Sequence, residues 1–466
     1  MAYTVNQATT GVQGAADQLI YVVQDTTNTG QPKFRYVCRV QLDTATIIKL
    51  KQLPNNSSCA VFDVQRVLQA YVYQDTSVYD LGLLGVDGTF DTTKIFGRNG
   101  AALRTFTMRF GYEYAPSATT QPQESLLPAT DTDVTVVNGS FLTPSGSYPL
   151  SSAAANDYKM TSNSKFFLSD AAVTMQDTGN VDDVVLYPVA YDRQPSKATL
   201  AFLNGNDVGA SQTVLFKVQY FQGPNGGYSA VLQNTASAGG AAPAAGLSDA
   251  ESLLYLGIGP FNLESQSIDA SLKPSANGDW THYDVVAMSS AVPGNEKSAT
   301  YRFVRQECSK HYTAENAYTI HWWNSKGGVD SLPLMARSTE SQTIEKEAIR
   351  TSGGNSLTAD GFAVPYEKTS AQGGKRAGRV RTTTTLQMNT VGGNPSVYTP
   401  FIKSLVNSSK AFISGPGMYG LNSGQPGSGL VQCYVTEAQK EYLTSVNDQS
   451  VSYALTVEIS RRRPNV

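Results

Sequence analysis

Apolar and polar side chains alternate along many short segments of this chain, and this alternation constrains the fold more than any other feature. In FTMRFGYEY (106–114) one face carries Phe106, Met108, Phe110, Tyr112 and Tyr114. The same pattern recurs in FRYVCRVQL (34–42), VLFKVQY (214–220) and SYALTVEIS (452–460). Alternation with a period of two is typical of strands that have one buried and one solvated face. The sequence therefore predicts a mainly β protein with several domains, built from antiparallel β-sandwiches.

Helical patterns are few and short, so we expect only a few short helices that cover the sheets. The three segments are FDVQRVLQAYV (62–72), LSDAESLLYLG (247–257) and TPFIKSLVNSSK (399–410). The first has a candidate N-cap at Asp63, and the second has Ser248 and Glu251 at capping-box spacing. The third places Thr399 as N-cap before Pro400 at the first helical position.

Two segments with the biased composition of linkers divide the chain. Residues 115–130 are rich in Pro, Ser and Thr, and residues 235–247 are dominated by Ala, Gly and Pro. We therefore expect four parts: an N-terminal β-sandwich unit (1–115), a middle β unit (116–234), a linker (235–247) and a C-terminal β-sandwich unit with short helices (248–466).

The surface that the composition predicts is neutral and polar. Charged residues make up only 16% of the chain, whereas tyrosine occurs 25 times. Broad protein interfaces are enriched in Tyr and depleted in Lys and Glu, so this composition favours an assembling protein. The formal net charge of −3 gives no nucleic-acid signature, and we expect no specific nucleic-acid partner.

The charge is unevenly distributed along the sequence. Between Tyr114 and Asp192 there are nine acidic residues and two basic ones, whereas Lys368–Thr436 contains seven basic residues and no acidic one. In a head-to-tail ring these regions could face each other across each subunit junction. The alternative is that both are solvated loops. The interface candidates from these regions are Asp182, Asp183, Lys375, Arg376, Arg379 and Arg381.

No motif in the sequence supports catalysis or a cofactor. Gly415, Gly417 and Gly420 form a GxGxxG, but Pro416 breaks the turn and a glycine-rich, non-helical stretch follows. The phosphate-cradling GxxxxGK[ST] and the nucleophile elbow GxSxG do not occur. We therefore expect no cofactor and no enzyme activity.

Metal and acid-pair chemistry is equally weakly supported. Cys308 and His311 in CSKH form only half of a zinc site, which needs two further ligands at fixed reach. The acid pairs Asp131/Asp133 and Asp182/Asp183 have the residue type of a glycosidase, but acid pairs in loops are usually solvated. Cys38 lies on the apolar face of its segment and is predicted to be a small buried hydrophobe.

Targeting and membrane signals are also lacking in the sequence. The start, MAYTVNQATTG, has neither a basic n-region nor an apolar h-region. No apolar run approaches the roughly 18 residues that a membrane span needs. We expect a protein without its own export signal and without a membrane partner.

The segment YTIHWWNSKGGVDSL (318–332) contains two of the three tryptophans of the chain. Alternation places Trp322 and Trp323 on opposite faces, so they cannot form one aromatic box. NSKGG (324–328) is a turn signal, and VDSL returns the chain, which predicts a β-hairpin. We expect Trp322 to anchor a core and Trp323 to lie under a helix or at a subunit interface.

The order of several segments resembles that of virion structural proteins of tailed bacteriophages, especially crAss-like phages and their relatives. The segments are FRYVCRV (34–40), LPNNSSCAVFDVQRVLQAYV (53–72), VNGSF (137–141), KFFLSDA (165–171), TLAFLNGN (199–206), YRFVRQE (301–307), the 318–332 hairpin and YTPFIKSLVNSSKAFI (398–413). LPLMA (332–336) departs from the alternating aromatics of the family. The resemblance implies no catalytic residues.

The resemblance implies a structural virion component of the tail, neck or baseplate, made in the host bacterial cytoplasm. We expect it to form a symmetric homo-oligomeric ring and to contact other tail or neck proteins. The alternative is a virion protein that binds host-surface glycans through the middle unit, 116–234. A third hypothesis is a polysaccharide depolymerase. Turnover of host capsule that is lost when one acid pair is changed would support it.

Overall fold

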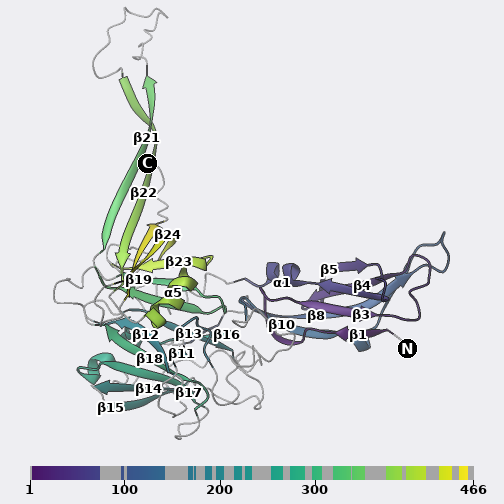
Figure 1. Cartoon of the computed structure of the whole chain (residues 1–466), viewed down its shortest axis with the longest axis horizontal. Helices are drawn as coiled ribbons and strands as arrows, with labels where there is room; N and C mark the ends of the chain where they lie inside the picture. Colours follow the sequence, from purple (N-terminus) through teal and green to yellow (C-terminus); the bar gives the residue numbers. More distant parts are fainter. Residues whose placement is uncertain are drawn as a thin grey trace, which may run out of the picture.

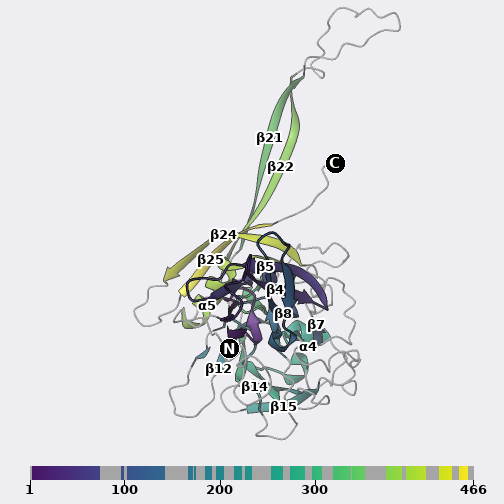
Figure 2. The same cartoon turned by 90° about the vertical axis from the view of Figure 1, so that its right-hand side faces the viewer.

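A computed structural model places an N-terminal β-sandwich to one side of a larger β body, from which a long hairpin projects in another direction (Figures 1 and 2). The fold is mainly β with a few short helices, as predicted. The structure describes residues 3–73, 96–98, 102–141, 166–171, 173–174, 184–191, 196–203, 215–222, 226–233, 253–265, 273–288, 296–306, 318–336, 338–351, 374–390, 395–415, 430–442 and 451–459.

The N-terminal sandwich consists of two sheets with the strand orders β1-β3-β6 and β2-β10-β8-β4-β5, and β9 pairs with β8. The strands are β1 (Thr4–Gln7), β2 (Gly11–Gly14), β3 (Ile20–Gln24), β4 (Arg35–Leu42), β5 (Ala45–Gln52), β6 (Cys59–Asp63), β8 (Leu103–Tyr114), β9 (Gln123–Leu126) and β10 (Thr132–Val137). One hydrophobic core joins the two sheets. Phe106, Met108, Phe110 and Cys38 are fully buried in it, which confirms the predicted inward faces of β8 and β4.

The N-terminal sandwich extends beyond the predicted boundary at residue 115. The segment 115–130, whose Pro-, Ser- and Thr-rich composition suggested this boundary, contributes β9 and the 3-10 helix η1 (Pro128–Thr130). β10 then pairs with β8 on one side and β2 on the other. Pro- and Ser-rich composition is compatible with a short edge strand such as β9. The sandwich therefore continues to Val137.

The body contains sheets that mix strands from all three predicted β units. Their orders are β11-β12-β18-β17-β14-β15 and β13-β16-β7. The strands are β7 (Phe96–Arg98), β11 (Val173–Thr174), β12 (Val184–Ala190), β13 (Thr199–Leu203), β14 (Leu215–Gln222), β15 (Gly226–Gln233), β16 (Leu253–Gly257), β17 (His282–Met288) and β18 (Thr300–Gln306). Because β12 pairs with β18 and β13 with β16, the two predicted units share sheets. The predicted linker 235–247 lies outside the described residues.

A seven-stranded sheet completes the body, in the order β20-β19-β23-β24-β25-β22-β21. Its strands are β19 (Tyr318–Trp323), β20 (Val329–Leu334), β21 (Thr339–Thr351), β22 (Gly374–Asn389), β23 (Ala411–Ser414), β24 (Val431–Tyr442) and β25 (Val451–Ile459). Tyr453, Leu455, Val457 and Ile459 are buried, as the alternation in β25 predicted. β21 and β22 continue beyond the body as the projecting hairpin, which we call the arm (Figure 1).

The helices are α1 (Gln65–Tyr71), α4 (Pro260–Ser265), α5 (Pro395–Asn407) and the 3-10 helix η4 (Pro274–Asn277). The predicted α1 is confirmed, but its N-cap is Val64, and Asp63 instead accepts a hydrogen bond from the Gln65 amide at 3.0 Å. Predicted helix 399–410 is confirmed with a different start, because α5 begins at Pro395 and contains Pro400. In the described part of the chain, no helix is long and apolar enough to cross a membrane.

The predicted helix at 247–257 was wrong. Residues 253–257 form strand β16, which lies between β13 and β7. Leu253, Tyr255 and Leu256 are buried, with at most 1% of each residue exposed. Pairing on both sides and burial outweigh the capping-box signal at Ser248 and Glu251, because helix propensity is small compared with tertiary packing.

Candidate functional site

The turn between β19 and β20 is built around one side chain, Asn324. Its Oδ1 accepts hydrogen bonds from the backbone amides of Lys326 (3.1 Å) and Gly328 (2.8 Å). Gly327 has a φ of +86°, a conformation that favours glycine. Asn and Gly in these positions explain why NSKGG turns the chain, and the predicted hairpin with its turn at 324–328 is confirmed.

The same turn contacts the end of the N-terminal sandwich. The Ser140 amide donates to the Ser325 carbonyl at 2.7 Å. A Cβ added at Gly139 would lie 2.4 Å from the Lys326 carbonyl carbon, and one added at Gly327 would lie 2.3 Å from the Asn138 carbonyl oxygen. The backbones approach so closely only because both residues are glycine. We call this contact between residues 137–141 and 324–328 the joint.

Asp17 fixes the N-terminal side of the joint. Its carboxylate accepts hydrogen bonds from the Ser140 hydroxyl at 2.7 Å and from the amides of Phe141 (3.0 Å) and Gly14 (3.1 Å). Asp17 is itself buried, with 1% of the residue exposed. Charge-assisted hydrogen bonds of this kind are stronger than neutral ones, so this carboxylate holds the 139–141 segment in place.

The two adjacent tryptophans belong to different cores. Trp322 lies in the body core, edge-on to Phe401 of α5, and its Nε1 donates to Ser404 Oγ at 2.9 Å. The prediction that Trp322 anchors a core is confirmed. Trp323 lies in a second core that joins the sandwich to the body and includes Val12, Leu103, Val137, Phe141, Tyr255 and Val329.

Trp323 was a candidate for contact with another subunit, and the structure corrects this. Only 4% of the residue is exposed, because residues of this same chain cover the ring on the joint side. A side chain buried to this extent is not available to a second subunit. Trp323 therefore belongs to the core that lies beside the joint.

A buried carboxylate, Asp330, connects three segments behind the joint. Its Oδ1 accepts hydrogen bonds from Ser169 Oγ (2.7 Å) and Tyr187 Oη (2.8 Å). Its Oδ2 accepts hydrogen bonds from the Asp170 amide (2.9 Å) and Asn324 Nδ2 (3.1 Å). Burial raises the pKa of Asp330 from its ordinary 3.8 to about 6. These four bonds tie segment 169–170, strand β12 and the turn together.

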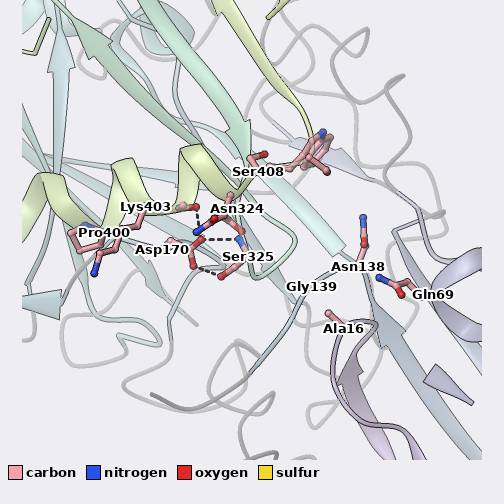
Figure 3. Close-up of a pocket in the computed structure, with 14 residues that line it drawn as sticks. Ala16, Gln69, Asn138, Gly139, Asp170, Asn324, Ser325, Pro400, Lys403 and Ser408 are labelled. Carbon is pink, nitrogen blue, oxygen red and sulfur yellow. Dashed lines mark hydrogen bonds between the residues drawn. The ribbon is translucent and has the colours of Figure 1, made fainter. Parts of the chain in front are cut away.

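Asp170 continues this network to the surface (Figure 3). It accepts hydrogen bonds from the Ser325 amide (2.7 Å), from Ser325 Oγ (2.6 Å) and from Ser404 Oγ of α5 (2.6 Å). Beside Asp170 lies a cleft of about 620 Å³ between the N-terminal sandwich and the body. The lining residues are Ala16, Gln69, Asn138, Gly139, Asp170, Trp323, Asn324, Ser325, Pro400, Lys403, Ser404, Asn407, Ser408 and Ser409.

The cleft offers hydroxyl and amide groups, which can exchange hydrogen bonds with a polar ligand. The described histidines lie elsewhere. His321 is buried between Ser331 Oγ (2.7 Å) and Ser414 Oγ (3.1 Å), and burial followed by the Lys197 charge lowers its pKa to about 3. His282 stacks on Phe221, with ring centroids 4.6 Å apart. Among the described residues, no group of three or more His, Cys, Asp or Glu is placed to hold a metal ion.

The charged candidates fall outside the joint. Lys375, Arg376, Arg379 and Arg381 lie on β22, in the arm. Asp182 and Asp183 lie outside the described residues, as do Cys308, His311, Gly417 and Gly420. The acidic and basic stretches that the sequence suggested as facing surfaces therefore remain a prediction.

The arm is the second candidate site, because one of its two strands, β21, is exposed along most of its length. Residues 339–348 are all exposed, so both faces of β21 meet solvent. In contrast, buried and half-buried residues alternate along β25. The arm also carries an exposed apolar residue, Ile344, with 54% of its surface accessible. Residues 339–348 of β21 therefore present a surface that the chain itself does not cover.

No protein-family model matches the chain, and no curated protein matches it in sequence. One similar solved structure is the tail of an empty GTA particle with C6 symmetry, at 12% identity over 30% of this chain and 90% of that chain, with a TM-score of 0.19. Another is the sixfold-symmetrised baseplate of the anti-feeding prophage, at 11% identity over 33% and 94%, with a TM-score of 0.19. A third is the calcium binding domain CBD12 of CALX1.1, at 10% identity over 62% and 80%, with a TM-score of 0.18. Scores this low do not establish a shared fold or function.

Proposed function

We propose that this protein is a structural subunit of a phage tail-type particle and that its copies assemble side by side into a closed ring. The exposed arm carries this proposal. Ten consecutive residues of β21, 339–348, are exposed. An isolated two-stranded ribbon is only marginally stable in water, and stable sheets need further strands or a packed face. The missing contacts of the arm are therefore supplied by other chains.

The joint supports the same proposal. A ring closes only when every subunit presents its two contact surfaces in one fixed relation. The close glycine contacts, the Asp17 and Asp330 hydrogen bonds and the shared core around Trp323 hold the sandwich and the body in one orientation. The joint is thus suited to set the geometry of an assembly rather than to bind a substrate.

The placement in a virion rests on the order of sequence segments that resembles structural proteins of tailed phages. Low charge and frequent tyrosine agree with broad subunit contacts. On this proposal the protein works through its shape, without catalysis, and its partners are further copies and neighbouring tail, neck or baseplate proteins.

Native mass spectrometry of the full chain and of an arm-shortened variant tests this function. Gln342 and Thr384 face each other across the ribbon, so residues 343–383 can be replaced by Asn-Gly, a two-residue hairpin turn. We expect a closed oligomer of defined copy number for the full chain and a folded monomer for the variant. A full chain that stays monomeric at every concentration, or a variant that forms the same oligomer, would contradict the proposal.

A second candidate function is binding of host-surface glycans, and the cleft at the joint favours it. Its lining is mainly hydroxyl and amide side chains, which suit a neutral polyhydroxyl ligand. Glycan-array binding by the full chain, compared with an Asn138→Ala/Asn407→Ala variant, tests this function. Binding that the variant loses would support it, whereas no binding, or binding that the variant retains, would remove the cleft from consideration.

A further inference from the structure

The arm has backbone edges that no other described strand pairs, in addition to the exposed residues 339–348 of β21. Among the described strands, β21 is the last in the order of its sheet. β22 pairs with β25 only from Thr384 onward, so residues 374–383 pair with β21 alone among these strands. Unpaired strand edges present rows of N–H and C=O groups that readily accept a strand from another chain. Each arm therefore offers one edge on β21 and another on β22.

The two edges carry different charge. β21 contains the acids Glu340, Glu345 and Glu347 and the bases Lys346 and Arg350, which gives 2 − 3 = −1. β22 contains no acid, and its bases Lys375, Arg376, Arg379 and Arg381 give +4. A two-fold dimer that paired β22 with β22 would bring +4 against +4. Pairing of β21 with β22 brings opposite charge together, and like charges across strands are destabilising.

We propose that the free edge of β21 in one copy pairs with the free edge of β22 in the next copy, so that the arms close into a β-barrel around the ring axis. This inference rests on the proposed ring function and identifies the two strands through which neighbouring copies contact each other. The contact is heterologous, since two different edges meet, and heterologous contacts form rings when the rotation closes. Closure of the barrel leaves no strand edge exposed in the arm.

The strand direction follows from symmetry. Within one copy β21 and β22 are antiparallel. Rotation about an axis along the arm leaves each strand direction unchanged, so β21 of one copy runs antiparallel to β22 of its neighbour. The rotation also preserves height along the axis. Thr343 faces Thr383 within one ribbon. In the ring, Thr343 of one copy therefore lies at nearly the same height along the axis as Thr383 of the neighbouring copy. The strand tilt that barrels require shifts the two residues along the strands.

Disulfide trapping between separately prepared variants tests this pairing. Thr343→Cys and Thr383→Cys chains are purified apart, mixed, assembled and oxidised, and the linked peptides are identified by mass spectrometry. Because each chain carries only one of the two new cysteines, a 343–383 link can form only between copies. Ala377→Cys and Arg381→Cys chains are each mixed with Thr343→Cys in the same way. They detect pairing in which strand tilt has shifted the partner of position 343 along β22. Circular dichroism confirms that each variant is folded.

We expect disulfides between position 343 and at least one of positions 377, 381 and 383. An oligomer of defined copy number that yields only 343–343 links, or no link at any of these positions, would overturn the edge pairing and leave the ring proposal standing. Chains that remain monomeric under all conditions would overturn both the pairing and the ring. The result therefore separates failure of the contact from failure of the function.

Discussion

Trp322 and Trp323 are neighbours on β19, yet their side chains fill different hydrophobic cores. Trp322 packs within the body against Phe401 of α5. Trp323 lies on the opposite face in the core shared with the N-terminal sandwich, with its ring centroid 6.4 Å from that of Tyr255. One strand thus anchors the body on one side and the joint on the other.

Replacing these tryptophans with alanine should have separable effects. Removal of a buried Trp costs about 3–5 kcal/mol of stability, so Trp322→Ala should lower the free energy of unfolding of the whole body by that amount. Trp323→Ala should mainly accelerate hydrogen exchange at 137–141 and 324–328, with β12 and β18 still protected. Chemical denaturation and hydrogen exchange followed by mass spectrometry measure both. Equal loss of protection everywhere in both variants would show that the joint is not a separate unit of stability.

The glycines of the joint should not tolerate a side chain. In Gly139→Ala the new Cβ would meet the Lys326 backbone at 2.4 Å, so the turn must move away. Overpacking of this kind costs about 1–3 kcal/mol. Gly30→Ala is the matched control, because nothing lies within 4 Å of its Cβ position. We expect a lower denaturation midpoint and a changed small-angle scattering profile for the first variant only. Unchanged scattering in Gly139→Ala would refute the close packing.

Asp330 should make stability depend on pH in a direction opposite to that of most carboxylates. Its pKa is raised from 3.8 to about 6, so the folded state keeps a proton that the unfolded state releases. The stabilisation from this group is complete below pH 3.8 and is lost as pH rises through about 6. The loss is (6 − 3.8) × about 1.4, or about 3 kcal/mol.

Denaturation of the wild type and Asp330→Asn at pH 4, 5, 6 and 7 measures this effect. Between pH 4 and 7 the wild type should lose about 2 kcal/mol of stability relative to Asp330→Asn, because the asparagine does not titrate. A pH-independent difference for Asp330→Asn would mean that folding does not raise the pKa of this carboxyl.

His321 should act in the opposite sense. Its pKa is lowered from 6.5 to about 3, so only the unfolded state takes up a proton just below pH 6.5. Stability from this group is complete above pH 6.5 and is lost as pH falls towards 3. Between pH 6.5 and 5 the loss is about 2 kcal/mol. In denaturation experiments, the free energy of unfolding of His321→Asn should fall correspondingly less between pH 6.5 and 5 than that of the wild type. An equal fall in both proteins would contradict a buried, neutral imidazole at position 321.

The exposed apolar residue of the arm should matter for assembly but not for folding. Ile344 is 54% exposed in the single chain, so burying its exposed part between copies contributes about 1–1.5 kcal/mol. Ile344→Ser should therefore raise the concentration at which oligomers dissociate by about fivefold to tenfold, as analytical ultracentrifugation measures. Val61→Ser, at a 44% exposed position of the N-terminal sandwich, is the control. Equal effects of both substitutions would argue against an arm contact.

Local patterns predicted the strands and the hairpin of this protein because their causes are local. The alternation in β8 and β25 identified the buried faces, and Asn324 with the following glycines marked the turn. Residues 253–257 show where local signals fail. There, pairing with β13 and β7, whose residues lie fifty or more positions away in the chain, outweighed a capping box.

The joint could not be predicted from the sequence, because it depends on segments that meet only in the fold. Asp330 accepts hydrogen bonds from Ser169 and Tyr187, which are 161 and 143 residues away along the chain. The glycines at 139 and 327 were visible, but the sequence did not show that each packs against the backbone of the segment that contains the other. Alternation placed Trp323 opposite Trp322 but could not tell an intramolecular core from a subunit contact.

Electron microscopy of the assembled protein at native concentration tests the central claim, ring assembly through the arm, most directly. Averaged images should show closed rings of one copy number, with the arms gathered around the axis and the N-terminal sandwiches outside them. Single particles without assembly at any concentration, or rings whose arms point outward and touch no neighbour, would contradict it.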